Sequence, residues 1–323
     1  MALPRILVLL FVCLFSLTAL SGQESFFEKA DTFHQGRFWT ISGFTAVAYT
    51  GTVIGLNELW YKGFERSGFH TFDDWGEWNQ MDKAGHAFTS YFETSYVYDF
   101  ARWTGMKDRS ALWTAVSLGT LFQGTVEMLD AYSEAWGFSF GDVAFNTAGS
   151  ALFAGQQLAW NEQRMVLKVS NRFPTYPERE IRNGDYTGFL SERTDELYGG
   201  AIPSRLLKDY NGQTIWLSVN PKSFFPESKW PSFLNIAIGY GSENLFGARS
   251  NSWEDDGVLL SLPESEFPRY RQIYISPDID LSRLKVKKPF WRMLLKGLNV
   301  FKIPAPALEF NLGRGMKFKP LYF

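Results

Sequence analysis

The fold of this chain is decided by three stretches: M-D-K-A-G-H at residues 81–86, G-T-V-E-M-L-D at 124–130, and G-F-S-F-G-D-V-A-F-N-T-A-G at 137–149. Each stretch sets two polar side chains three or four residues apart among apolar and small residues. The pairs are Asp82 with His86, Glu127 with Asp130, and Asp142 with Asn146. Residues at these spacings share one face of an α-helix. We therefore expect three successive helices whose polar pairs are buried together or form one site.

The surrounding sequence predicts four helices, at residues 38–57, 82–103, 110–126 and 142–160. The first and third contain no charged residue, and the fourth has Gly149 and Gly155 among small residues that let helices approach closely. A helix that spans a bilayer needs about 20 predominantly apolar residues, and these segments reach that length only marginally. The sequence predicts an N-terminal four-helix bundle, either membrane-embedded or buried within the protein.

The C-terminal part reads as β-structure. Strands are expected at residues 214–219, 233–240, 271–275 and 307–318, the last because apolar and polar residues alternate along it. One helix is expected at 289–300, because Pro289 fits a first helical position and apolar residues follow along one stripe. The predicted fold class is therefore α+β, with the four-helix bundle followed by a small curved antiparallel sheet that this one helix covers.

The N-terminus is typical of a secretory signal peptide, with Arg5 before an apolar run and a small-residue cleavage site at Ala19-Leu20-Ser21. The expected organisation is a signal peptide at 1–21, a helical domain at 22–161, an irregular linker at 162–210 and a β-rich domain at 211–323. The linker is expected to be irregular because three prolines interrupt it. The only cysteine, Cys13, follows Phe11 and Val12 rather than a small residue, so a lipid anchor is not expected.

Composition narrows the class of partner. The chain has 323 residues, and its 34 acidic and 32 basic residues give a net charge of −2, which offers no electrostatic basis for binding nucleic acid. Its 12 tryptophans and 30 phenylalanines exceed what a soluble core needs, and such an excess often accompanies membrane interfaces. We expect an exported periplasmic protein associated with a membrane or lipid, the outer membrane being favoured, with a second envelope protein as a possible partner.

The candidate site residues are the six paired residues and one neighbouring lysine: Asp82, Lys83, His86, Glu127, Asp130, Asp142 and Asn146. A carboxylate four residues before a histidine can hold one ring nitrogen and raise the basicity of the other. A single histidine among carboxylates is not a zinc pattern, so no metal is expected. No cofactor is expected either, because the nucleotide- and phosphate-binding motifs are missing. The cluster is either a buried network that fixes helix packing or a binding or catalytic site.

The order of these motifs resembles a known family. D-K-A-G-H at 82–86, E-M-L-D at 127–130 and G-F-S-F-G-D-V-A-F-N-T-A-G at 137–149 are similar to an uncharacterised family of predicted periplasmic lipoproteins. More distantly, they resemble the VanZ-like membrane proteins, whose D-K-x-x-H, E-x-x-Q and D-x-x-x-N-x-x-G elements come in the same order. The resemblance covers about residues 82–159 and implies a compact helical envelope domain with clustered polar residues. It implies no reaction, and Cys13 and the β-rich half depart from it.

Two functions remain open. The first is a non-enzymatic envelope protein whose helical domain packs around the polar cluster. The second is an enzyme or small-ligand binder acting on an envelope lipid or glycan, with His86 as general base and Glu127 or Asp142 as acid. The second function requires His86 to lie within about 10 Å of Glu127 or Asp142, since greater separations exceed direct or one-water reach.

Overall fold

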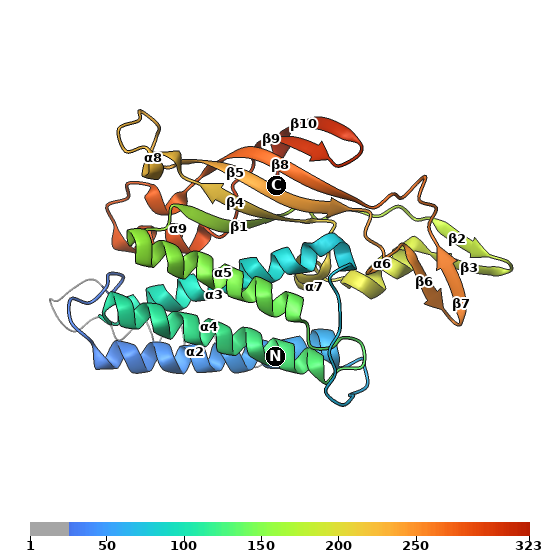
Figure 1. The fold of residues 1–323 in the computed structure, drawn as a ribbon, viewed down its shortest axis with the longest axis horizontal. Helices are drawn as coiled ribbons and strands as arrows, with labels where there is room; N and C mark the ends of the chain where they lie inside the picture. Colours follow the sequence, from blue (N-terminus) through green and yellow to red (C-terminus); the bar gives the residue numbers. More distant parts are fainter. Residues whose placement is uncertain (1–25) are drawn as a thin grey trace.

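The computed structural model describes residues 26–323. The predicted signal peptide and Cys13 lie outside the described residues. The described chain forms a helical layer with a sheet stacked on it (Figure 1). The C-terminal half builds the sheet and the short helices that connect its strands.

The four predicted helices are present. They are α2 (Gln35–Leu56), α3 (Met81–Trp103), α4 (Asp108–Ala131) and α5 (Phe140–Trp160). A π-helical turn, η1 (Asn57–Tyr61), extends α2, and a short 3-10 helix, η2 (Glu77–Gln80), leads into α3. Ser139 begins α5 by accepting a hydrogen bond from the Asp142 backbone N–H at 3.1 Å, which is the N-cap role its sequence favours.

Helix α3 lies at the centre of the helical layer, between α4, α5 and the sheet. The helix α2 lies furthest from the sheet (Figure 1). Among residues 26–323 no helix combines the length and hydropathy that a bilayer crossing requires. The expectation of a membrane-embedded bundle is therefore not supported, because threonine, serine and glycine lower the hydropathy of these helices as the sequence already indicated.

The C-terminal half contains a six-stranded antiparallel sheet with the strand order β1-β4-β5-β8-β9-β10. Its strands are β1 (Met165–Asn171), β4 (Gln213–Val219), β5 (Leu234–Glu243), β8 (Tyr270–Ile279), β9 (Ala305–Asn311) and β10 (Gly315–Tyr322). Two small hairpins flank it, β2 (Glu180–Asn183) with β3 (Tyr186–Phe189) and β6 (Ser252–Asp255) with β7 (Val258–Ser261). The short helices are α6 (Leu190–Tyr198), α7 (Ile202–Lys208), α8 (Pro221–Phe224), η3 (Leu281–Arg283) and α9 (Pro289–Leu298).

Two segments of the C-terminal half differ from the secondary structure that the sequence predicts. Residues 162–210, expected to be irregular, contain the edge strand β1, the β2–β3 hairpin, α6 and α7. The single strand expected at 307–318 is a hairpin, because Gly313 (φ +80°) and Gly315 (φ +97°) adopt the left-handed backbone that a tight turn needs. The domain boundaries themselves stay a prediction.

The sheet curls so that its second strand, β4, comes within hydrogen-bond distance of its last strand, β10. Thr214 on β4 and Tyr322 on β10 share a hydrogen bond of 2.9 Å, although β5, β8 and β9 lie between these two strands in the sheet. The enclosed face holds an aromatic core, in which Trp216 and Tyr274 are fully buried beside Tyr322. Ala84 and Ala87 of α3 line a cleft with apolar residues of the opposite face. This side therefore packs on the helical layer.

The helix α9 does not take the covering role predicted for it, since α3 lies against the sheet instead. Helix α9 contacts the C-terminal half of α3, where Tyr96 donates to the Gly297 carbonyl and Lys296 pairs with Asp99 at 2.5 Å. It also contacts the segment before α2, where Arg292 pairs with Glu28 at 3.1 Å. An apolar stripe on a helix shows that it packs against something, but not against which element.

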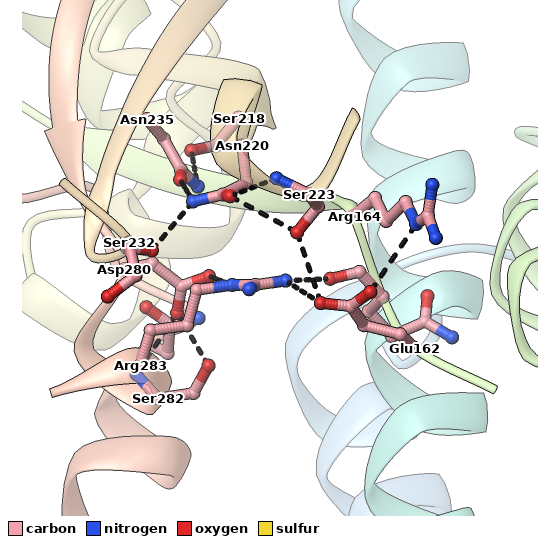
Figure 2. Close-up of polar contacts among 12 residues, drawn as sticks. Glu162, Arg164, Ser218, Asn220, Ser223, Ser232, Asn235, Asp280, Ser282 and Arg283 are labelled. Carbon is pink, nitrogen blue, oxygen red and sulfur yellow. Dashed lines mark hydrogen bonds and ion pairs between the residues drawn. The ribbon is translucent and has the colours of Figure 1, made fainter. Parts of the chain in front are cut away.

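A set of polar contacts joins the end of α5 to the segments that flank the sheet (Figure 2). Glu162, just after α5, accepts hydrogen bonds from Arg283 at 2.7 Å and from the Ser223 hydroxyl at 3.0 Å. Arg283 also donates to Asp280, so three segments distant in sequence meet at this point. This junction fixes the helical layer relative to the sheet and so fixes which α3 residues face the sheet.

Candidate functional site

The three polar pairs converge at one end of the helical layer. Asp82, Lys83 and His86 belong to the first two turns of α3, Glu127 to the last turns of α4, and Asp142 and Asn146 to the first two turns of α5. Because α3 and α5 both begin at the end of the bundle where α4 finishes, these short stretches meet there. The structure thus brings together six of the seven candidate residues.

Lys83 forms the centre of this cluster. Its side chain is only 1 % exposed, and its ammonium lies 2.6 Å from Asp142 Oδ1, 2.7 Å from Asp74 Oδ2 and 3.1 Å from Asp82 Oδ2. Three carboxylates therefore surround a buried cation, which is the arrangement that makes a buried charge tolerable. Lys83 is the group that holds α3, α5 and the loop before η2 in register.

His86 lies beside this ammonium and is oriented by an amide. Its Nδ1 is 3.2 Å from Asn146 Oδ1, while the Asn146 Nδ2 donates to Glu127 Oε1 at 3.3 Å. Because the amide nitrogen is engaged by Glu127, the amide oxygen faces the ring, and we assign the proton on Nδ1 as the donor to it. The other ring nitrogen, Nε2, then faces Asp142 Oδ1 at 3.5 Å and Asp82 Oδ1 at 3.7 Å.

Two contributors to the cluster were missed from the sequence. Asp74 binds Lys83 and also accepts from the Ser139 hydroxyl at 2.7 Å. Tyr210, which precedes β4, donates to Asp82 Oδ1 at 3.0 Å. Asp74 sits in an aromatic loop and Tyr210 lies 128 residues from its partner, so no local spacing could have indicated either contact.

Asp130 is the candidate that the structure places elsewhere. Its carboxylate accepts a hydrogen bond from Tyr61 at 2.8 Å and so ties the end of α4 to the π-helical turn after α2. It lies one turn from Glu127 on α4, as its spacing predicts, but its hydrogen bond is to the Tyr61 hydroxyl rather than to a residue of the cluster.

Burial and crowding change the protonation of these groups. Burial raises the pKa of Asp142 to about 8, with the nearby Asp82 carboxylate adding to the effect, and burial raises the pKa of Glu127 to about 7. Burial opposes ionisation of Asp82 too, but His86 and Lys83 outweigh it and hold its pKa below the usual value. For His86, burial would lower the pKa, and the carboxylates of Asp82, Asp142 and Glu127 raise it overall. Groups that titrate near neutrality often mark functional sites.

The cluster is open to solvent on one side. The side chains of Asp82 and His86 are 25 % and 18 % exposed, whereas those of Glu127 and Asp142 are 1 % and 8 % exposed. His86 lies 3.9 Å from Glu127 Oε1 and 3.5 Å from Asp142 Oδ1. The distance condition for an acid–base or ligand-binding site is therefore met, and a small polar molecule could reach the Asp82–His86 side.

Residues 71–155 match a family model described as "Predicted periplasmic lipoprotein (DUF2279)", a domain of unknown function, which confirms the predicted family for this segment. The match contains every candidate site residue and supports export to the periplasm. No comparison supports the more distant similarity to VanZ-like proteins. No curated protein and no solved structure matches the chain.

Proposed function

We propose that this chain is a non-enzymatic envelope protein that lies against a lipid surface through α2, with the polar cluster holding its helical layer together. The observation that carries the lipid contact is α2 itself. None of its 22 residues is buried, and no charged residue occurs between Phe38 and Asn57. The family's description as a lipoprotein supports a location at a membrane.

The exposed side chains of α2 form an apolar stripe. Trp39, Val47 and Ile54 are 65 %, 69 % and 58 % exposed, and their spacings of eight and seven residues place them on one side of the helix. Fully burying one such side chain is worth about 1.5–3 kcal/mol. Three half-exposed side chains therefore contribute several kcal/mol toward binding a lipid surface.

The neighbouring helix extends this surface. Helix α4 runs beside α2 (Figure 1). Three of its apolar side chains are also exposed, those of Trp113, Leu121 and Met128. Tyr49 joins the two helices by a hydrogen bond of 2.6 Å to Thr125 and by a ring contact with Phe122. Exposed apolar groups on two adjacent helices enlarge the apolar area available to a partner, and large exposed apolar areas typically mark interaction sites. A bilayer fits it because the charge-free run of α2 offers no partner for a charged protein surface.

The test is vesicle binding by the Val47→Glu/Ile54→Glu variant. We expect the unacylated wild-type protein to co-sediment with vesicles of phosphatidylethanolamine and phosphatidylglycerol, and the variant to lose at least about tenfold in affinity, because two carboxylates must enter the interface. The matched control is Phe225→Glu/Leu259→Glu, which alters equally exposed residues of the sheet half, 69 % and 61 % exposed. Equal binding of vesicles by both variants would contradict the proposal. So would a wild-type protein that forms dimers through α2 and does not bind vesicles.

A second function is favoured by the geometry around His86. Its Nε2 faces two carboxylate oxygens on the open side of the cluster, so it is placed to exchange a proton with a small bound molecule. This is the enzymatic or ligand-binding alternative, with an envelope lipid or glycan as the substrate class.

The single variants Asp82→Asn and His86→Gln discriminate between the two functions. If the cluster is a site, both should fold with nearly unchanged thermal midpoints yet fail to complement a strain that lacks the protein. If it is a structural network, any loss of complementation should accompany a lowered midpoint. Asp99→Asn is the control, since it changes a partly exposed carboxylate on the same helix that pairs with Lys296.

A further inference from the structure

The open side of the cluster has the donor set of a metal site. Asp82, His86 and Asp142 each offer one ligand atom, and these atoms all lie within 4.8 Å of one another. One imidazole and two carboxylates suit divalent first-row metals such as zinc, iron and manganese. Three protein ligands also leave a coordination position for water or substrate, as in catalytic zinc sites.

The distances around His86 Nε2 are those of two ligands on one ion rather than those of a hydrogen bond. Nε2 lies 3.5 Å from Asp142 Oδ1 and 3.7 Å from Asp82 Oδ1, beyond the roughly 2.7–3.2 Å of an N–H···O bond. Ligand atoms at about 2.0–2.2 Å from a tetrahedral ion are about 3.4 Å apart. An ion between them would therefore need only small side-chain adjustments.

The neighbouring groups orient the three ligands. Asn146 engages Nδ1 of His86, which leaves the lone pair of Nε2 directed at the two carboxylates. Lys83 contacts Oδ2 of Asp82 at 3.1 Å and Oδ1 of Asp142 at 2.6 Å, and the Tyr210 hydroxyl donates to Oδ1 of Asp82 at 3.0 Å. These donors orient both carboxylates, and each oxygen on the histidine side keeps a further lone pair for an ion. Partners of this kind fix tautomer and orientation at known metal sites, where a histidine ligand almost always donates its second N–H to an oxygen.

Charge also favours a cation here. Four carboxylates, those of Asp74, Asp82, Glu127 and Asp142, converge on one ammonium and one imidazole. With all four carboxylates ionised and the imidazole neutral, the formal charge is −3, and either bound protons or a bound cation can offset that buried excess. We propose that Asp82, His86 and Asp142 bind one divalent transition-metal ion, with Lys83 and Asn146 as positioning residues. The proposal is independent of the lipid contact of α2.

The test is titration of the full exported chain, first stripped with EDTA, with Zn²⁺ alone in a calorimeter. We expect one ion per chain, and loss of at least about 100-fold in affinity for His86→Ala, because even removal of an outer partner typically costs 10–100-fold. His34→Ala is the control, since His34 is an exposed histidine at the start of α2 and lies outside the cluster. The control should bind Zn²⁺ like the wild type.

A spectroscopic measurement covers variants that fold poorly. Co²⁺ added to the wild-type protein should give the visible absorption of a tetrahedral nitrogen–oxygen site, and Asp142→Asn should change that spectrum. Failure of the folded wild type to bind either ion would overturn the proposal. The histidine would then interact with the two carboxylates through a proton on Nε2 and not through a metal ion. Binding that survives His86→Ala, or is lost in His34→Ala, would equally overturn it and assign the ion to a surface histidine.

Discussion

Replacement of Lys83 by methionine is expected to destabilise the protein by about 3–5 kcal/mol. The ammonium is 1 % exposed and lies within 3.1 Å of three carboxylates. Methionine fills a similar volume but leaves those carboxylates without their cation, and breaking a buried ion pair by removing one partner costs this much. The free energy of unfolding from urea titration measures the effect.

The control for this prediction is Lys62→Met. Lys62 also pairs with a carboxylate, that of Glu58 at 2.7 Å, but the two side chains are 68 % and 52 % exposed. Such a pair one helical turn apart contributes only about 0.3–0.5 kcal/mol. A Lys83→Met variant no less stable than Lys62→Met would show that the carboxylates are neutralised by other means, and the cluster could not be the element that holds the helices together.

The convergence of the cluster could be predicted from the sequence because it depends on local spacing. Asp82 with His86 and Asp142 with Asn146 share helix faces at any tertiary arrangement, and Ser139 caps the helix it precedes. The central role of Lys83 could not be predicted in the same way. A lysine beside an aspartate is usually solvated, and its burial here depends on Asp74, a loop residue whose position follows from the tertiary fold.

The sheet shows the same division between local and distant causes. The strands β4, β5 and β8 were predicted because their apolar residues are continuous or alternate. The edge strand β1, with the sequence M-V-L-K-V-S-N, was missed because it opens the segment 162–210, which was expected to be irregular from its prolines. Those prolines all follow β1 and do not interrupt it. Lys168 of β1 is fully buried and pairs with Asp278 of β8 at 2.7 Å, a contact between segments far apart in the sequence.

Helices α3 and α5 approach each other closely at Gly149, and this yields the second large effect. A Cβ at position 149 would lie 2.1 Å from the Ala87 carbonyl oxygen and 3.0 Å from the Tyr91 backbone nitrogen on α3. These are backbone atoms of a helix, so they cannot rotate away as a side chain could. Gly149→Ala is therefore expected to push α5 from α3 and to cost about 2–3 kcal/mol, as overpacking of a tight core does.

Gly155, on the same helix, is the matched control because no atom lies within 4 Å of the position its Cβ would occupy. Gly155→Ala should stabilise the protein by up to about 1 kcal/mol, since alanine loses less backbone entropy than glycine in a helix. The two substitutions add the same methyl group and differ only in what it meets. The same helix pair is joined by Ser90 of α3, whose hydroxyl bonds the Asn146 carbonyl at 2.6 Å and the Ser150 hydroxyl at 2.7 Å. Urea titration of both variants should therefore give opposite signs, and a neutral Gly149→Ala would mean that α3 and α5 pack less closely than the cluster requires.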